Sequence, residues 1–215
     1  MTPYNPLMLW QIIAFDGFDE LDVVAPFEVL RMAAARQPRW RVELAAIDAP
    51  CEITANHGLR VQVAARLGPA AGPGRPDVVI VPGGGWISRK PTGARTEIAR
   101  GAIPAALAEL HRAGTLVTSV CTGAMLLAAA GLLKDRPAVT HHDALENLSA
   151  VGAQIIPARV VDAGNIVTSG GITSGLDLAL HLVERFADAA LARELECALE
   201  YEGREEAWRP PPPTA

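Results

Sequence analysis

Cys121 has the sequence context of a catalytic nucleophile. It follows the strand-like run Leu116 to Val120 and precedes Thr122 and Gly123, small residues that can open a helix. A thiol at a helix N-terminus lies near the positive end of the helix dipole and near unpaired N–H groups, and both favour the nucleophilic thiolate. With Ser119 and Gly123 flanking it, Cys121 occupies the cysteine counterpart of the G-x-S-x-G nucleophile elbow. The alternative is a buried structural thiol, because free cysteines are among the most buried residues.

The other two cysteines lack this context. Cys51 opens a short strand-like segment and Cys197 lies within a helical pattern, so both are interpreted as packing residues. Three cysteines at wide spacing fit neither a disulfide framework nor a zinc cluster. We therefore expect three separate thiols.

Two glycine-rich segments follow buried strands. Gly83-Gly84-Gly85 can direct backbone N–H groups at a developing anion, or can simply form a tight turn. Trp86 follows at once, so the segment does not match the G-x-G-x-x-G fingerprint and no dinucleotide cofactor is expected. The second segment, Gly170 to Gly175, resembles a turn into a helix capped by Thr173, and its functional interpretation is a wall of the same pocket.

His141 and His142 come directly after a strand-like segment, on the side of the sheet where the pocket is expected. One of them can pair with Cys121 as a base or electrostatic partner. Two neighbours on an extended segment point to opposite faces, and no third ligand has suitable spacing, so no metal is expected. The remaining histidines, His57, His111 and His181, are interpreted as surface or core-edge residues.

Acidic residues crowd the start of the first predicted helix. Most of them are explained by the preference of negative charge for the positive end of a helix. Asp22 differs because its carboxyl group is at a junction that can face the pocket. Beside a thiolate its pKa would rise, and it could stay protonated as a proton donor.

Apolar runs of strand length alternate with longer helical patterns, which predicts an α/β three-layer sandwich with a doubly wound, mostly parallel sheet of the flavodoxin-like type. Ligands bind outside the carboxyl ends of the strands in such sheets. Strands are predicted at 7–15, 41–47, 51–54, 59–63, 78–81, 116–120, 138–140 and 166–169. Helices are predicted at 21–35, 97–113, 122–133, 144–151, 173–186 and 189–201.

Composition limits the possible partners. The 215 residues predict one domain, 1–208, followed by a proline-rich tail, 209–215. With 19 basic and 24 acidic residues the formal charge is −5, and no basic run is present, so nucleic acid is not an expected partner. The apolar stretch 7–15 is too short for a membrane span or a secretory signal, so we expect a cytoplasmic protein.

Taken in order, five motifs resemble the ThiJ/PfpI superfamily, with its class I glutamine-amidotransferase-like fold. The resemblance extends from about Leu7 to Glu202, and it is strongest to the isonitrile (isocyanide) hydratase branch. The motifs lie at 21–29, 81–85, 119–124, 140–141 and 170–175.

The resemblance implies roles for particular residues. The nucleophile falls on Cys121, the following threonine on Thr122, the acidic partner on Asp22 and the histidine after the elbow on His141. Aspartate rather than glutamate at the acidic position favours the hydratase branch over glyoxalases and deglycases. A tryptophan is expected after the histidine in that branch, but this chain has His142, which changes the pocket wall. The pocket is expected to use Gly84, Gly85, His141, His142 and Gly171 for substrate binding.

The implied activity is cysteine-dependent hydration of isocyanides to N-substituted formamides by a hydro-lyase without a cofactor. The resemblance also implies a homodimer that acts on a small-molecule substrate. Two other classes remain open: a glyoxalase, deglycase or amidase with the same cysteine, and a non-enzymatic oxidation or ligand sensor, because an accessible low-pKa thiol is easily oxidised.

Overall fold

The computed structural model describes residues 7–88, 90–203 and 206–211, and its centre is a seven-stranded sheet. The strands of this sheet are, in chain order, β1 (Met8–Ile13), β2 (Trp40–Ala46), β5 (Ala65–Arg66), β6 (Val78–Val81), β7 (Leu116–Ser119), β10 (Val160–Asp162) and β11 (Ile166–Ser169). They lie in the order β10-β11-β7-β6-β1-β2-β5, and every neighbouring pair is parallel except β10 and β11.

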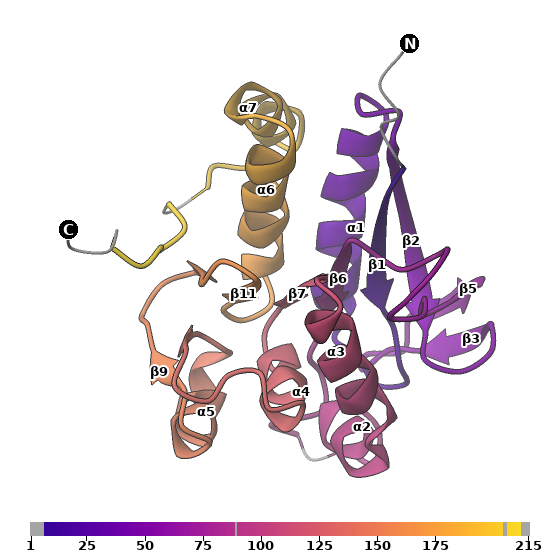
Figure 1. The fold of residues 1–215 in the computed structure, drawn as a ribbon, viewed down its shortest axis with the longest axis vertical. Coiled ribbons are helices and arrows are strands. Elements are labelled where there is room, and N and C mark those ends of the chain that lie inside the picture. The colour runs from indigo at the N-terminus through magenta and orange to yellow at the C-terminus, as the bar shows by residue number, and fades with distance from the viewer. Residues whose placement is uncertain (1–6, 89, 204–205, 212–215) are drawn as a thin grey trace.

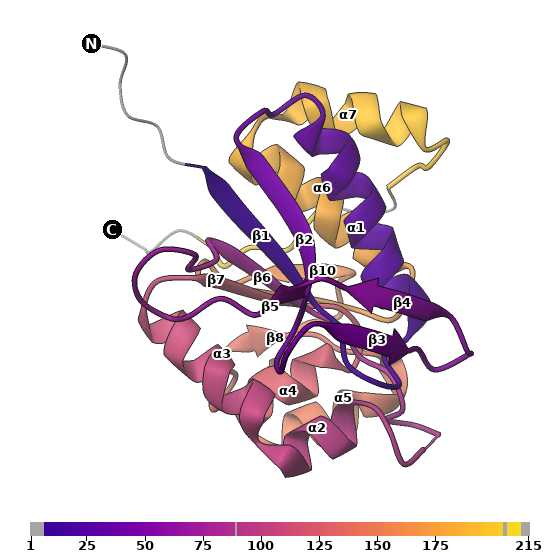
Figure 2. The ribbon, with the colours of Figure 1, turned by 90° about the vertical axis from the view of Figure 1, so that its right-hand side faces the viewer.

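Helices cover both faces of the sheet. They are α1 (Glu20–Ala34), α2 (Ala94–Arg100), α3 (Ala102–Arg112), α4 (Gly123–Ala129), α5 (Leu145–Ala150), α6 (Ser174–Phe186) and α7 (Ala189–Ala198), with a 3₁₀ turn, η1, at His142–Ala144. One layer holds α1, α6 and α7, and the other holds α2 to α5 (Figures 1 and 2). The predicted three-layer α/β sandwich is confirmed.

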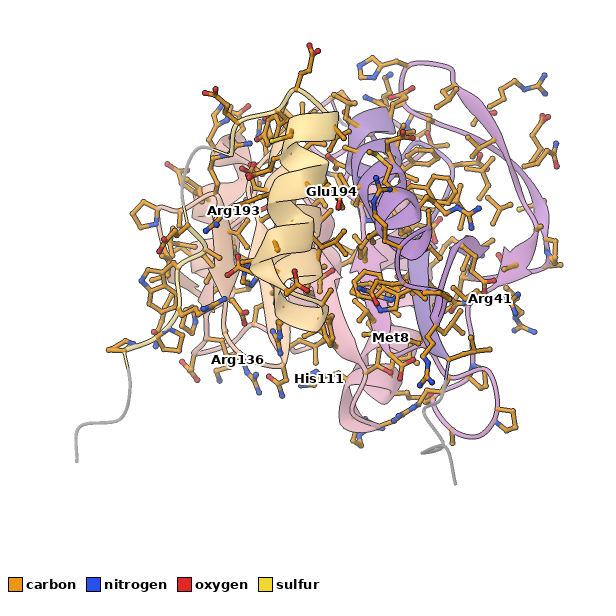
Figure 3. All side chains as sticks on the ribbon, turned by 90° about the horizontal axis from the view of Figure 1, so that it is seen from above. Met8, Arg41, His111, Arg136, Arg193 and Glu194 are labelled. Atoms are coloured by element: carbon orange, nitrogen blue, oxygen red, sulfur yellow. The ribbon has the colours of Figure 1, made fainter. Side chains whose placement is uncertain are left out.

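The first layer is held partly by charged side chains. Glu194 of α7 faces α1, where it pairs with Arg36 just past the end of that helix at 2.6 Å, while Arg193 projects from the other side of α7 (Figure 3). Both partners of this pair are well exposed, so it orients the two helices more than it stabilises them.

The central strands end level with one another. β6, β7 and β11 are buried at every position, as expected for parallel strands covered on both faces. Ser119 at the end of β7 pairs with Val81 of β6 on one side and Thr168 of β11 on the other. The three loops that follow these strands therefore meet at one edge of the sheet.

Three predicted elements differ from the structure. The helix expected over 97–113 is divided into α2 and α3 at Gly101, whose φ of 76° is left-handed. The helix expected over 122–133 ends at Ala129, before Gly131, which has a φ of 75°. The strand expected over 138–140 is a two-residue strand, β8 (Pro137–Ala138), that pairs with β9 (Gln154–Ile155) outside the central sheet.

Other elements were missed because they are very short. β5, β9 and β10 have two or three residues, too few to show a hydrophobic period. The predicted hairpin is present as β3 (Cys51–Thr54) and β4 (Arg60–Val63), which pair antiparallel. Trp208 adds a short parallel bridge to β10, so ordered backbone pairing reaches the end of the predicted domain. The tail residues 212–215 lie outside the described residues.

No helix in the described ranges combines the length and the apolar character that a membrane crossing requires.

Substitution of Gly123 should test how tightly α4 packs on the end of β6. A Cβ at this position would overlap the carbonyl oxygen of Val81, which is fixed backbone. We expect Gly123→Ala to lower the free energy of unfolding by about 3 kcal/mol, measured by urea denaturation. The matched control is Gly101→Ala, where nothing lies within 4 Å and only the left-handed backbone opposes the change, at about 1 kcal/mol. Equal losses in the two variants would contradict the proposed contact.

Candidate active site

Cys121 lies on a sharp turn between β7 and α4, as the nucleophile-elbow pattern predicts. Its φ is 56°, a left-handed value that non-glycine residues adopt rarely. The backbone N–H donates to the carbonyl of Gly170 at 2.9 Å, and the carbonyl accepts from the Thr140 hydroxyl at 2.9 Å. These two bonds hold the strained residue in place, which is typical of functional turns.

Asp22 lies beside the thiol in the first turn of α1. The residue is completely buried, and its Oδ2 accepts the N–H of Gly83 at 2.8 Å. Its Oδ1 is also buried and receives no N–H or O–H donor within the described residues. The thiol of Cys121 is the neighbouring group that interacts with this carboxyl. The structure therefore brings together the two residues that the sequence placed 99 positions apart (121 − 22 = 99).

Burial controls the ionisation of both groups. Loss of solvation raises the pKa of the Asp22 carboxyl well above its usual range, and the nearby charge of Asp19 raises this pKa further. Burial also raises the pKa of the Cys121 thiol, as does a negative charge on Asp22, although the backbone N–H groups of Ile172 and Thr122 oppose this effect. Desolvation is the larger effect on the thiol pKa, and it opposes the thiolate that the helix N-terminus and its N–H groups favour. Both pKa shifts favour the protonated forms of the two groups.

The Gly83-Gly84-Gly85 loop is tied to the neighbouring elements by its own amides. The N–H of Gly83 goes to Asp22, and the N–H of Gly84 goes to the Thr122 hydroxyl at 3.1 Å. A Cβ at Gly83 would overlap Thr122, and one at Gly84 would overlap the carbonyl of Gly17. The glycines therefore let three backbone segments approach closely, and the first two amides are already engaged in this conformation.

His141 and His142 differ in their surroundings. The His141 side chain is 16% exposed and its ring lies against Gly171, whereas the His142 side chain is 77% exposed. The Nδ1 of His141 accepts the backbone N–H of Asp143 at 3.2 Å, so the proton of the neutral ring is on Nε2. Burial lowers the pKa of His141, and His142 adds to this effect.

The two rings do not point apart, contrary to the expectation for an extended segment. They stack with centroids 4.2 Å apart, because the chain turns into the η1 helix at His142.

A pocket of about 240 Å³ opens at the Cys121 side chain. Five of the predicted site residues line it: Cys121, Thr122, Gly84, Gly85 and His141. Asp22 lies behind the thiol, while Gly171 and His142 line an adjacent hollow. Ile172 also lines the Cys121 pocket, in agreement with the interpretation of the Gly170 to Gly175 segment as a pocket wall. Seven further lining residues were not identified from the sequence: Asp19, Asn56, His57, Trp86, Ile87, Ser88 and Asp143.

The hairpin turn reaches the pocket through a long-range contact. Glu20, at the start of α1, accepts the backbone N–H of His57 at 2.6 Å and contacts its Nδ1 at 2.7 Å. These bonds bring Asn56 and His57 to the pocket mouth. No local pattern distinguishes Glu20 from its acidic neighbours, so His57 was interpreted as a surface residue only.

Three smaller expectations need correction. Cys51 and Cys197 are exposed, so neither is a packing residue in this chain. Thr173 precedes α6, but its side chain makes no capping bond and instead accepts a hydrogen bond from Arg159 at 3.1 Å.

Two side-chain groups at the pocket rim have ligand atoms within 4.8 Å of one another, as metal sites do. They are His141 with His142 and Asp143, and Asp19 with Glu20 and His57. In the second group, Glu20 and His57 are already joined by the hydrogen bonds that hold the hairpin.

Comparison with known proteins agrees with this architecture. Residues 11–185 match the DJ-1/PfpI family. The chain is 32% identical over 192 residues to an isonitrile hydratase of Pseudomonas putida, covering 88% of this chain and 76% of that protein. It is 29% identical to a deglycase of Thermococcus kodakarensis, covering 74% and 87% of the two chains. A ThiJ/PfpI family protein of Pseudomonas syringae superposes with a TM-score of 0.77 at 26% identity, covering 99% of this chain and 81% of that one. The chain belongs to the DJ-1/PfpI family.

Proposed function

We propose that this protein hydrates isocyanides to N-substituted formamides, with Cys121 as the nucleophile and Asp22 as the proton donor. The observation that carries the proposal is the buried pair of a thiol and a carboxyl group, both with raised pKa values. The similarity to an isonitrile hydratase at 32% identity supports the same assignment.

The first step adds the thiol across the terminal carbon of the isocyanide. The sulfur of Cys121 forms a bond to this carbon while the carbon gains a proton from Asp22, and Asp22 recovers the proton of the thiol. The product is a thioimidate, in which the carbon carries hydrogen, sulfur and a double bond to nitrogen. The N–H groups of Ile172 and Thr122 lower the energy of the charge that develops on sulfur.

The second step is hydrolysis of this intermediate. Water adds across the C=N bond, so the carbon gains a hydroxyl group and the nitrogen gains a proton. The C–S bond then breaks as the hydroxyl proton passes to sulfur, which leaves an N-substituted formamide and free Cys121. We assign the positioning of this water to two residues that line the pocket. These are Thr122, through its hydroxyl group, and His141, whose neutral ring carries its proton on Nε2.

The main alternative is attack on an α-oxoaldehyde, as the similarity to a deglycase suggests. Such an attack creates an alkoxide, which needs N–H donors aimed at its oxygen. The amides of Gly83 and Gly84 are already donated to Asp22 and Thr122. Attack on an isocyanide needs a proton at carbon instead, and the protonated Asp22 supplies one. Methylglyoxal turnover faster than isocyanide turnover would favour the alternative.

An oxidation sensor is less well supported. Peroxide reacts with the thiolate, and burial at Cys121 disfavours that form. Selective peroxide oxidation of Cys121 without turnover of either substrate class would favour the sensor.

Loss of the thiol should abolish the reaction. We expect Cys121→Ala to reduce kcat/KM for a simple isocyanide by about 10⁴-fold or more, because the proposed covalent intermediate forms on the Cys121 sulfur. Formamide production, followed by chromatography, measures this directly. Cys197→Ala, which removes an exposed thiol far from the pocket lining, is the matched control and should retain full activity. Retained hydration in Cys121→Ala would overturn the mechanism.

Asp22→Asn should separate catalysis from stability. A raised folded-state pKa means that the folded protein holds its proton more tightly than the unfolded chain, so wild-type stability falls as pH rises above about 4. Asparagine carries no charge and can still accept the Gly83 N–H. We expect activity to fall about 100-fold. We also expect the stability of the variant relative to wild type to rise by about 1.4 kcal/mol per pH unit until Asp22 ionises.

Urea denaturation between pH 4 and 9 provides the measurement. Asp48→Asn, which removes an exposed carboxylate, is the control and should keep the pH dependence of wild type. Parallel curves for wild type and Asp22→Asn would contradict a raised pKa.

We also propose that two copies of the chain associate near the start of α1. Leu21 and Val24 of this helix are 46% and 40% exposed, and Leu59 of the adjoining hairpin is 42% exposed. Glu20 ties this hairpin to the helix, which makes these side chains part of one face. We expect wild type to sediment as a dimer and Val24→Glu to shift it toward monomer, since a charge would be buried in the contact. A monomeric wild type would contradict this proposal.

A further inference from the structure

A second hollow of about 590 Å³ adjoins the Cys121 pocket. His141 and Ile172 line both spaces, so these two side chains form the partition between them. The floor of the hollow is the Gly170–Ile172 segment, which also accepts the Cys121 N–H and offers the Ile172 N–H to the sulfur. The hollow is therefore built on the same loop that holds the nucleophile.

The pocket at Cys121 is small for a complete substrate. Its volume of about 240 Å³ lies below the range of roughly 300–1,000 Å³ that is usual for small-molecule sites. The reacting group and its nearest atoms fit there. Any large substituent has to extend into a neighbouring space, and the hollow behind His141 is the larger of the two.

The lining of the hollow suits an uncharged group. Its walls include Val139, Leu145, Ile155, Pro157 and Ala158. The cationic side chain in the described lining is Arg159, whose guanidinium is held by Asp177 at 2.6 and 2.8 Å. Because this guanidinium is neutralised within the protein, it is not free to bind an acidic ligand, and the apolar walls favour an uncharged group.

The partition at His141 is held by packing. A Cβ added to Gly171 would come within 2.5 Å of the His141 ring, so glycine is what lets the ring lie flat against the loop. Burial lowers the pKa of His141 and so favours its neutral form, which suits contact with an apolar group. The Asp143 N–H is its hydrogen-bond partner on Nδ1.

We propose that the hollow bounded by Ala158, Gly171 and His141 is the subsite for an apolar N-substituent of the substrate. The inference rests on the proposed isocyanide hydration and names its substrate class: isocyanides with a bulky alkyl or aryl group. An isocyanide is linear at nitrogen, so its substituent projects straight away from the carbon that sulfur attacks. His141 determines how large a substituent passes from one space to the other.

Filling the hollow should change substrate preference without changing the chemistry. In Ala158→Leu, a larger side chain occupies the hollow and does not reach the Cys121 pocket, whose lining excludes residue 158. We expect kcat/KM for benzyl isocyanide to fall by about 30-fold, mainly through KM, while the value for methyl isocyanide stays within about twofold of wild type. Ala158→Val should give an intermediate loss and remains informative if the leucine variant does not fold. Ala190→Leu, an exposed position on α7, is the matched control and should behave as wild type.

A second readout does not depend on hydration. Iodoacetamide and N-benzyl iodoacetamide alkylate the same sulfur but differ in the substituent, and mass spectrometry measures labelling of Cys121. We expect wild type to favour the benzyl reagent and Ala158→Leu to lose about tenfold of that preference. His141→Ala, which opens the partition, should increase it.

Hydration and labelling together distinguish a failure of the proposed function from a failure of the proposed subsite. If wild type hydrates no isocyanide but Ala158→Leu still removes the labelling preference, the proposed function is wrong and the subsite stands. If wild type hydrates isocyanides while Ala158→Leu leaves both the substrate ratio and the labelling ratio unchanged, the subsite proposal is overturned and the function stands.

Discussion

A carboxyl group and a thiol buried against each other dominate this structure, because neither can ionise cheaply where it lies. Asp22 is completely buried and Cys121 is 6% exposed. The carboxyl is held by a single backbone N–H from Gly83, which is too little to offset the loss of water around a charge. The arrangement requires three chain segments to meet within hydrogen-bonding distance. This requirement explains the level ends of β6 and β7 and the absence of side chains at Gly83 and Gly123.

The raised pKa values determine how Cys121 would act in its proposed role as a nucleophile. A thiolate stabilised in advance would react with many electrophiles and would be oxidised readily. A thiol that keeps its proton until a substrate arrives loses it only when another group can take it, and Asp22 is the group in place. In the proposed mechanism, sulfur and carboxyl therefore act as one unit, in which the proton lost by one is available to the other. This coupling suits a reaction that adds sulfur and hydrogen to the same carbon.

The sequence predicts those parts of the fold that are determined by neighbouring residues. The β-branched run before Cys121 and the small residues after it predict the elbow, and the positive φ of Cys121 agrees. One predicted helix is divided at Gly101, because this residue has a left-handed backbone conformation. The apolar residues on either side still fit a helical spacing, so the sequence pattern does not reveal the break. The raised pKa of Cys121 could not be predicted from the local sequence, because the residues that exclude water from the thiol are distant in sequence. The dipole of α4, in contrast, follows from the residues next to Cys121. His57 reaches the pocket only through Glu20, and no spacing rule connects residues 20 and 57.

The two sides of the pocket differ in burial: one is formed by buried backbone and short side chains, and the other by exposed loops. The side that holds Asp22, Cys121 and Thr122 is buried backbone and short side chains fixed by hydrogen bonds to other segments. The other side consists of the hairpin turn at His57, the loop after Gly85 and the His141 segment, where several of the lining side chains are exposed. Substitutions on the first side disturb the core, whereas those on the second change the shape of the pocket at little cost to folding. The exposed side is therefore where the shape of the pocket can vary at little cost to folding. His142, where a tryptophan was expected, lies in the His141 segment of that side and lines the adjacent hollow.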